Sequence, residues 1–284
     1  MKFNKKLTVV ITGAANGIGR ALALECHQRG YNVYATDLDI NTMRDMQRPN
    51  LHTLKLDVNN SEDIQNLLER LSDDGVVPDM LINNAGFGAM APLMDLPHER
   101  LKLQFETNVF SVVALCQAIV PLMVDHRSGR IVNIGSVSGV MTTPFAGAYC
   151  ATKAAVHSLS DALRMELKPF GIDVIVVMPS SIRSNFGSAA ASAISKGLKV
   201  KSLYAPIADA ITARAMMSQQ SKSISSEEFA RLMIDAVTAK HPASMIGIGP
   251  GGFLLPFTKR FVPLSLIDRL LMAKFKLNRL KVVS

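Results

Sequence analysis

The chain has no tryptophan and only three cysteines, Cys26, Cys116 and Cys150, which stand far apart in the sequence. None of them forms a C-x-x-C pair, so neither a disulfide framework nor a cysteine-based metal site is expected. The six histidines do not cluster at the spacing of metal ligands. We therefore expect free thiols and no catalytic metal.

Long hydrophobic runs are also missing. A membrane-spanning helix needs roughly 20 consecutive apolar residues, and no stretch of this chain predicts one. The basic residues at the N-terminus are followed at once by a short β-branched segment, not by the apolar core and cleavage site of a signal peptide. Because 48% of the residues are hydrophobic, we expect a packed globular protein located in the cytoplasm.

The net charge of +8 is concentrated toward the C-terminus. Basic residues there alternate with apolar ones and match no nucleic-acid module, so no nucleic-acid partner is expected. The segment Pro263–Lys281 predicts a basic amphipathic helix, with Leu264, Ile267, Leu271 and Phe275 at helical spacing. Two interpretations stay open: peripheral contact with a membrane surface, or packing over the substrate pocket or a second subunit.

Strand-like and helix-like segments alternate along the rest of the chain. Apolar strands are predicted near residues 7–12, 32–36, 51–56, 79–82, 130–135, 172–178 and 244–248, with long helices at 98–123 and 147–169. This order predicts an α/β fold: a doubly wound, Rossmann-type parallel sheet of about seven strands, with helices on both faces, in a single domain. Residues 1–252 would form the catalytic domain, including a substrate loop at 180–226, and residues 253–284 a C-terminal extension.

A glycine-rich turn follows the first strand, in the run Thr12 to Gly19. Glycine lets the backbone turn sharply and approach a phosphate, and the start of the next helix adds free N–H groups. Cofactor contacts are therefore assigned to this turn, from Gly13, Asn16, Gly17, Ile18 and Gly19.

Asp37 closes the second strand, about twenty positions after the glycines. A carboxylate there accepts hydrogen bonds from a ribose and repels a 2′-phosphate. Neither Asn16 nor Leu38 supplies a cation that would offset this repulsion. The sequence therefore predicts NAD as the cofactor, with NADP less favoured.

Tyr149 and Lys153 are four residues apart on a predicted helix, so both side chains project from one face. A neighbouring ammonium group favours the phenolate and is expected to lower the pKa of Tyr149 toward working pH. Ser136 follows the fifth strand, where its hydroxyl can bind the oxygen of a substrate. This trio predicts proton transfer to or from an alcohol or ketone.

Taken in order, these motifs resemble the short-chain dehydrogenase/reductase family from about Leu7 to Ser184, including members that act on retinol and hydroxysteroids. The resemblance implies that Lys153 also holds the nicotinamide ribose and that Asn108 anchors a water in a proton relay. Asp57 and Val58 would bind the adenine, and Pro179, Ile182 and Ser184 the carboxamide. The run Asn84, Ala85 and Gly86 would support the cofactor cleft. Ser180 stands where the family has glycine, which puts the geometry of that loop in doubt.

The residues expected to face the substrate are mostly apolar, and no Arg or Lys is placed among them to bind a carboxylate or phosphate. They are Phe87, Ser138, Met141, Phe145 and Phe186. We expect a lipophilic alcohol or ketone as substrate and, from the resemblance, a homodimer or homotetramer formed through the two long helices. Two alternative functions are an NADPH-dependent 3-oxoacyl-type reductase and a dinucleotide sensor without turnover.

Overall fold

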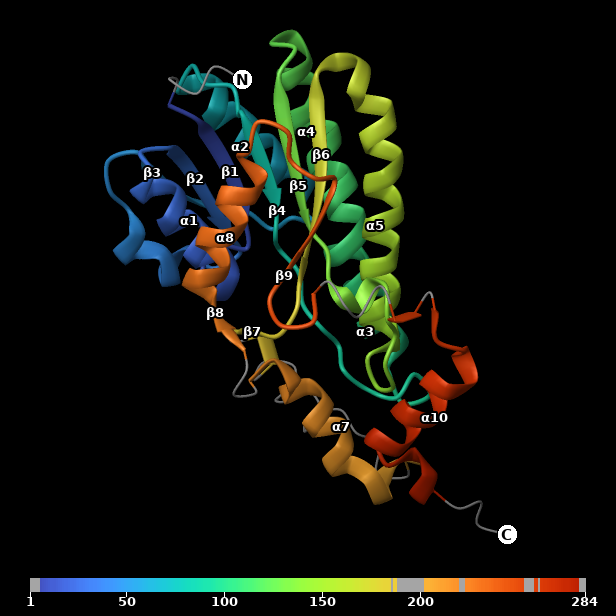
Figure 1. Cartoon of the computed structure of the whole chain (residues 1–284). Coiled ribbons are helices and arrows are strands. Elements are labelled where there is room, and N and C mark those ends of the chain that lie inside the picture. Colours follow the sequence, from blue (N-terminus) through green and yellow to red (C-terminus); the bar gives the residue numbers. More distant parts are fainter. Residues whose placement is uncertain are drawn as a thin grey trace.

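The computed structural model describes residues 6–184, 186–187, 202–219, 223–252, 258–259 and 261–280. Seven strands form one parallel sheet in the order β3-β2-β1-β4-β5-β6-β9 (Figure 1). Their bounds are β1 Thr8–Thr12, β2 Asn32–Asp37, β3 Leu51–Lys55, β4 Met80–Asn83, β5 Gly129–Ile134, β6 Ile172–Pro179 and β9 Met245–Ile248. The doubly wound sheet predicted from the sequence is confirmed.

Helices cover both faces of this sheet. One face carries α1 (Gly17–Gln28) and α8 (Ser226–Val237), which pack together through buried residues such as Leu22 and Phe229. The other face carries α2 (Ser61–Asp73), α4 (Ser111–Asp125) and α5 (Gly147–Leu167). The central strands are apolar on both faces because each face is buried.

The long helix predicted at 98–123 is interrupted. It consists of α3 (His98–Phe105), a π-helical turn η2 (Glu106–Phe110) and α4. By length and composition, His98–Asp125 is one helical stretch apolar enough to cross a membrane. Residues such as Leu115 and Ile119 are buried against the sheet, so the apolar composition of this stretch is that of a core helix. The π-helical turn places Asn108 inside the protein, and such turns are often found at functional sites.

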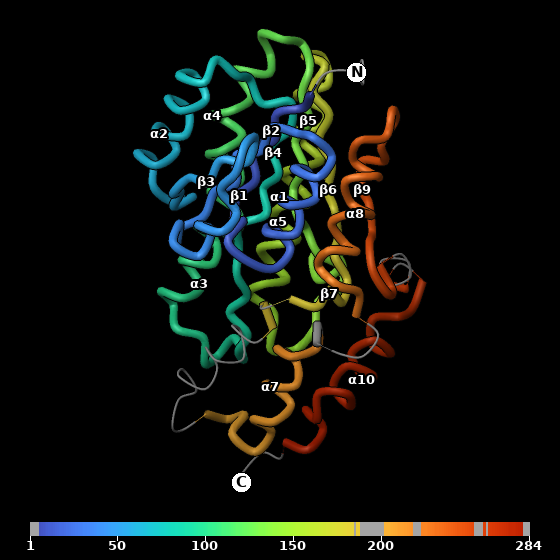
Figure 2. Tube along the Cα trace, turned by 90° about the vertical axis from the view of Figure 1, so that its left-hand side faces the viewer, coloured from blue at the N-terminus to red at the C-terminus, as the bar shows by residue number. Residues whose placement is uncertain are grey.

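Beyond the carboxyl ends of the strands lies a second layer, which we call the cap: residues 205–217 and 261–280. It contains η5 (Ala205–Ile207), α7 (Ala208–Ala215), the start of η6 (Met216–Gln219), α10 (Leu264–Lys274) and η7 (Leu277–Arg279). Figures 1 and 2 show α7 and α10 side by side at the end of the molecule away from the N-terminus. Shorter elements complete the described fold: η1 Ile40–Met46, η3 Val137–Gly139, η4 Lys168–Phe170, β7 Ile182–Arg183 and β8 Ile224–Ser225.

The C-terminal helix is shorter than predicted. It ends at Lys274, and Lys276 adopts a left-handed conformation (φ +61°) and pairs with Asp209 of α7. Phe275 is buried there with 3% of its surface exposed, whereas Leu264 at the other end of the helix is 65% exposed. Only the C-terminal end of the predicted apolar face is therefore buried by packing.

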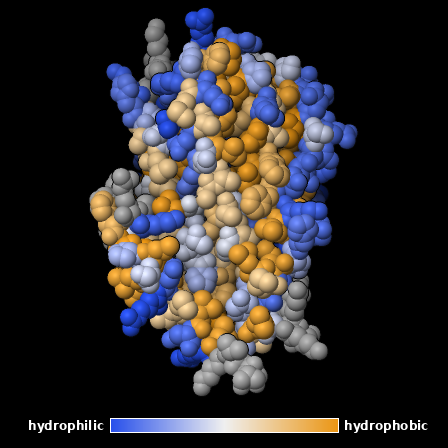
Figure 3. Space-filling model, turned by 90° about the vertical axis from the view of Figure 1, so that its right-hand side faces the viewer, coloured by the Kyte–Doolittle hydropathy of each residue, from blue (hydrophilic) through white to orange (hydrophobic). Residues whose placement is uncertain are grey.

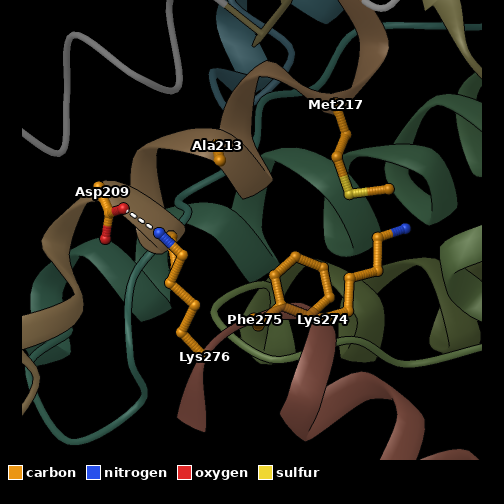
Figure 4. Close-up of a pocket in the computed structure, with 7 residues that line it drawn as sticks. Asp209, Ala213, Met217, Lys274, Phe275 and Lys276 are labelled. Atoms are coloured by element: carbon orange, nitrogen blue, oxygen red, sulfur yellow. Dashed lines mark hydrogen bonds and ion pairs between the residues drawn. The ribbon is translucent and has the colours of Figure 1, made fainter. Parts of the chain in front are cut away.

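A hollow of about 140 Å³ lies along the seam between α7 and the C-terminal segment (Figure 4). Lys276 forms an ion pair with Asp209 across this seam, and Phe275 and Met217 line it. The hollow thus marks where the C-terminal segment packs against α7.

Candidate active site

The predicted site residues gather at the carboxyl edge of the sheet. β1 and β4 are neighbours in its centre, and the chain winds outward from them in opposite directions. In such sheets the crevice between these two strands is where ligands bind. The glycine turn follows β1, Asn84 follows β4 and Ser136 follows β5.

The glycine turn has the geometry that a phosphate requires. Gly13 and Gly17 have positive φ angles of +68° and +55°. A Cβ on Gly13 would lie 2.8 Å from the Cα of Ala85, and one on Gly19 would lie 2.0 Å from the Gly13 carbonyl oxygen. Asn16 makes no side-chain hydrogen bond to the first turn of α1. The donors of that turn, Ile18 among them, are thus not capped by the N-cap side chain, which suits a pyrophosphate.

A brace joins the glycine turn to the end of β4. The Asn84 side-chain amide donates to the carbonyl oxygens of Thr12 (2.9 Å) and Gly13 (3.0 Å). In return, the Thr12 hydroxyl accepts from the backbone N–H groups of Asn84 and Ala85, both at 3.0 Å. Thr12 was not among the predicted site residues, although a hydroxyl at the last strand position before the glycine could have indicated this role.

The Asp37 carboxylate faces the glycine turn. One oxygen accepts the Ala15 N–H at 2.9 Å and the other accepts the Asp39 N–H at 3.2 Å. Val58 is buried at the end of β3, and Asp57 accepts the Asn59 N–H at 2.9 Å. These carboxylates flank the part of the crevice that would hold an adenosine.

Tyr149 and Lys153 project from α5 toward the end of β5. The Lys153 ammonium lies 5.9 Å from the centre of the Tyr149 ring and donates to the carbonyl oxygen of Ile134 at 2.6 Å. Burial lowers the pKa of Lys153 to about 8. Ser136 is hydrogen-bonded to the Tyr149 side chain. The structure therefore brings the predicted trio together.

The expected direction of the Tyr149 shift was wrong. Burial raises the pKa of Tyr149 to about 12, and the Ser136 hydrogen bond and the Arg214 charge oppose the rise only in part. Desolvation of the phenolate outweighs the nearby cations in the protein alone. Lys153 directs its ammonium to the Ile134 carbonyl, which explains why it does not act on Tyr149 as the sequence suggested.

Asn108 is buried in the π-helical turn with its side chain fully engaged. Its oxygen accepts the Phe87 N–H at 3.0 Å, and its amide donates to the Phe87 carbonyl (2.9 Å) and the Thr152 hydroxyl (3.1 Å). Asn108 thus holds the segment after β4 against α5. Its role as an anchor for water stays a prediction.

His157 is a neighbour of Ser136 that the sequence did not single out. Its Nε2 accepts the Ser136 N–H at 3.3 Å, so the ring is neutral in this arrangement. Burial, with the Lys153 charge, lowers the pKa of His157 to about 4. A Cβ on Gly135 would lie 2.4 Å from Nε2, so glycine is needed there for the ring to fit. The signal in the sequence is its position on α5, one turn after Lys153.

An apolar cluster surrounds Tyr149 on the cap side. The Phe186 ring lies 5.4 Å from the Tyr149 ring, and Phe145 contacts the rings of Tyr204 and Phe275 at 6.1 Å each. Phe145 has a φ of +64°, a strained conformation for an aromatic residue. Of the five predicted substrate residues, Phe145 and Phe186 belong to this cluster. The other three, Phe87, Ser138 and Met141, are half-buried outside it.

A basic residue also reaches this cluster, and the expectation that none would do so was wrong. Arg214, on α7, is 8% exposed and donates through Nε to the Thr143 hydroxyl at 2.6 Å. Its charge acts on Tyr149. Arg214 is 65 positions from Tyr149 in sequence, and no motif surrounds it, so only the folded chain reveals the contact.

The segment after β6 faces the glycine turn. Pro179 ends β6, Ile182 is buried in β7, and the Ser184 Cβ lies 3.4 Å from where a Cβ on Gly17 would be. Ser180, at the position where the loop geometry was in doubt, donates its hydroxyl to the Pro250 carbonyl at 2.6 Å. Ser180 therefore ties the end of β6 to the loop after β9.

Comparison with known proteins agrees with this geometry. The model of the short chain dehydrogenase family matches residues 7–194. A 3-ketodihydrosphingosine reductase of Bacteroides thetaiotaomicron is 36% identical over 183 residues, which cover 63% of this chain and 65% of that relative. The NADPH-dependent 1-acyldihydroxyacetone phosphate reductase of Saccharomyces cerevisiae is 28% identical over 283 residues, 96% of this chain and 93% of the relative.

A solved short-chain dehydrogenase from Streptomyces avermitilis has the same fold, with a TM-score of 0.78 at 24% identity over 97% of this chain and 98% of that one. Among the described residues, no three potential ligands cluster to hold a metal ion. The family match spans the glycine turn, the strand ends and α5. This chain spans slightly less than two thirds of the length of the bacterial reductase above. It belongs to the short-chain dehydrogenase family.

Proposed function

We propose that this protein interconverts a lipophilic secondary alcohol and its ketone, or a retinol-like alcohol and its aldehyde, with Tyr149 as the acid/base and NAD(H) as the cofactor. The observation that carries the proposal is the placement of Tyr149, Ser136 and Lys153 at the carboxyl edge of the sheet. This edge also holds the glycine turn.

In the direction of reduction, the Tyr149 hydroxyl donates a proton to the carbonyl oxygen and Ser136 hydrogen-bonds the same oxygen. A bound nicotinamide supplies the hydride. With a pKa raised to about 12, Tyr149 is protonated at neutral pH, the state from which it can donate. Lys153, whose pKa is about 8, stays mostly charged at neutral pH and would hold the nicotinamide ribose. The Ser136 hydrogen bond and the Arg214 charge are the interactions that favour the phenolate that remains.

The preference for NAD(H) rests on Asp37. Its carboxylate lies beside the glycine turn, where it would accept hydrogen bonds from the adenosine ribose and repel a 2′-phosphate. The pyrophosphate would rest on Gly13, Asn16, Gly17, Ile18 and Gly19, and the carboxamide against Pro179, Ile182 and Ser184. The yeast relative is named as NADPH-dependent, so the ratio of the two cofactors is a direct test of Asp37.

A lipophilic substrate is supported by the cluster of Tyr149, Phe145, Phe186, Met90 and Ile211, which is apolar and lies between the cap and α5. Both relatives described above are named as reductases of a lipid ketone. Within the predicted substrate loop at 180–226, α7 contributes Ile211 and Ala215 to this cluster, whereas residues 185, 188–201 and 220–222 lie outside the described residues.

Two surfaces are proposed for partners. On α10, three apolar residues are exposed beside two basic ones: Leu264, Leu270 and Met272 beside Arg269 and Lys274. This combination suits peripheral contact of the 253–284 extension with the anionic cytoplasmic surface of a membrane. On the two long helical stretches, exposed apolar residues such as Phe110 at the end of η2 and Met165 on α5 suit a homodimer or homotetramer. Figure 3 shows apolar side chains gathered along one side of the molecule.

A panel of lipophilic ketones and alcohols, assayed with NADH, NADPH and their oxidised forms by nicotinamide absorbance, tests this function. We expect turnover of long-chain ketones with NADH preferred. Preference for NADPH with a 3-oxoacyl thioester would instead favour the 3-oxoacyl reductase. Cofactor binding without turnover of any panel member would refute the enzymatic proposal.

A further inference from the structure

We propose that Arg214 binds an anionic group of the substrate, so that the lipophilic ketone carries a phosphate or carboxylate near its reacting carbon. This inference rests on the function proposed above and narrows its substrate class. Arg214 is held in α7 of the cap, at the layer that covers the carboxyl edge of the sheet (Figure 1).

Arg214 is a buried cation without an acidic partner. Only 8% of its surface is exposed, and its Nε donates to the neutral Thr143 hydroxyl. Among the described residues, no Asp or Glu pairs with it, and the remaining stretches of the sequence contain no Asp or Glu. The nearest acid on its helix, Asp209, is exposed and paired with Lys276.

Such an arrangement is costly unless a ligand compensates. Taking a guanidinium out of water without a counter-charge costs several kcal/mol, which is why buried charges are normally paired. Burial lowers the pKa of Arg214, and the groups that oppose this are Cys150 and Tyr149, neither an anion at neutral pH. The Nε bond to Thr143 orients the guanidinium, whose two terminal nitrogens can form bidentate bonds with phosphate and carboxylate.

The position of Arg214 fixes where the anion would lie. Its helix contributes Ile211 and Ala215 to the apolar cluster that contains Tyr149 and Phe186. Thr143, which holds its Nε, belongs to the loop between Ser136 and Tyr149. A second buried cation, Lys153, lies 5.9 Å from the centre of the Tyr149 ring and donates to the Ile134 carbonyl. The anionic group of the ketone would lie against Arg214, beside the apolar cluster that contains Tyr149.

The test compares matched ketones with and without charge. One pair is hexadecanoyl-dihydroxyacetone phosphate and its dephosphorylated counterpart; the other is 3-oxohexadecanoate and its methyl ester. In Arg214→Leu we expect the KM of the charged members to rise by roughly 30-fold or more, with the neutral members changing less than about threefold. Arg214→Lys should recover part of the loss, and whichever pair responds identifies phosphate or carboxylate.

Arg231→Leu is the matched control, because it removes the same charge from an exposed position of α8 on the far side of the core. NADH affinity, measured by fluorescence, should be unchanged in Arg214→Leu. An equal rise in KM for charged and neutral ketones, or weaker NADH binding, would overturn the proposal. Either result would indicate an effect on Tyr149 or on the cofactor.

A binding assay separates this inference from the proposed function. With NADH present, dodecyl phosphate or dodecanoate should raise the Tm of the wild type more than dodecanol does, and Arg214→Leu should abolish that difference. If no ketone is reduced but the difference is seen and lost in the variant, the anion site stands and the proposed reaction fails. An equal Tm shift in both proteins rejects the site, and Arg214→Gln replaces the leucine variant if that one does not fold.

Discussion

The region that would hold the cofactor and the cap are built by different means. In residues 8–86, the contacts come from backbone geometry and from short motifs at strand ends, such as Gly13, Asp37 and Asn84. In the cap, they come from side chains of distant segments, such as Phe145 with Phe275 and Thr143 with Arg214. The residues proposed to bind the cofactor are therefore specified by local sequence motifs, whereas those proposed to bind the substrate are brought together by long-range packing.

Tyr149→Phe gives the largest expected effect, because Tyr149 stands where the two regions meet. Loss of the hydroxyl should lower kcat by about 10³- to 10⁴-fold, the upper range for general acid catalysis. The ring remains to pack on Phe186, so NADH affinity and Tm should change little. Steady-state kinetics and fluorescence titration check both, and a kcat within tenfold of wild type would remove Tyr149 as the acid.

Phe275→Ala probes the cap alone. Truncating a buried aromatic costs about 3 kcal/mol or more, and here it removes the contact with Phe145. We expect faster proteolysis of the cap and a higher KM for ketone, with unchanged NADH affinity. Phe170→Ala, in η4 outside the cap and 47% exposed, is the control and should be nearly silent. If Phe275→Ala weakens NADH binding as much as ketone binding, the two regions are not separable.

Asp37→Asn probes the cofactor region alone. The amide oxygen can still accept the Ala15 N–H, so the local structure should persist while the charge is lost. We expect the NAD to NADP ratio of kcat/KM to fall by roughly tenfold, about the 1.4 kcal/mol of one charge-assisted hydrogen bond. The ketone KM should not move. An unaltered ratio would show that Asp37 does not select the cofactor.

The smallest expected effect near neutral pH is the pH dependence of stability from His157. Its pKa is about 4 in the folded protein and about 6.5 in the unfolded chain, so the unfolded chain binds the proton first. This contribution is present above pH 6.5 and is lost as pH falls toward 4, by about 0.7 kcal/mol between pH 7 and pH 6. Urea unfolding at several pH values should show a flatter profile for His157→Gln. Identical profiles would contradict the buried neutral ring.

Much of the fold could be predicted from the sequence, because parallel strands are continuous apolar runs and glycine marks the turn where side chains do not fit. The same holds for the Tyr149 and Lys153 pair, which shares one helix face. The break in the long helix at Asn108 was not predictable, since a π-helical turn depends on the hydrogen bonds that Phe87 and Thr152 offer to the amide.

The sequence by itself determined the family, the sheet and the edge of the sheet where the proposed site residues lie, because these depend on local periodicity and spacing. Only the tertiary structure decided the pKa of Tyr149, the neutral state of His157 and the presence of Arg214 in the apolar cluster. Those properties follow from desolvation and from charges that folding brings together over long sequence separations, and neither quantity is encoded in any single motif.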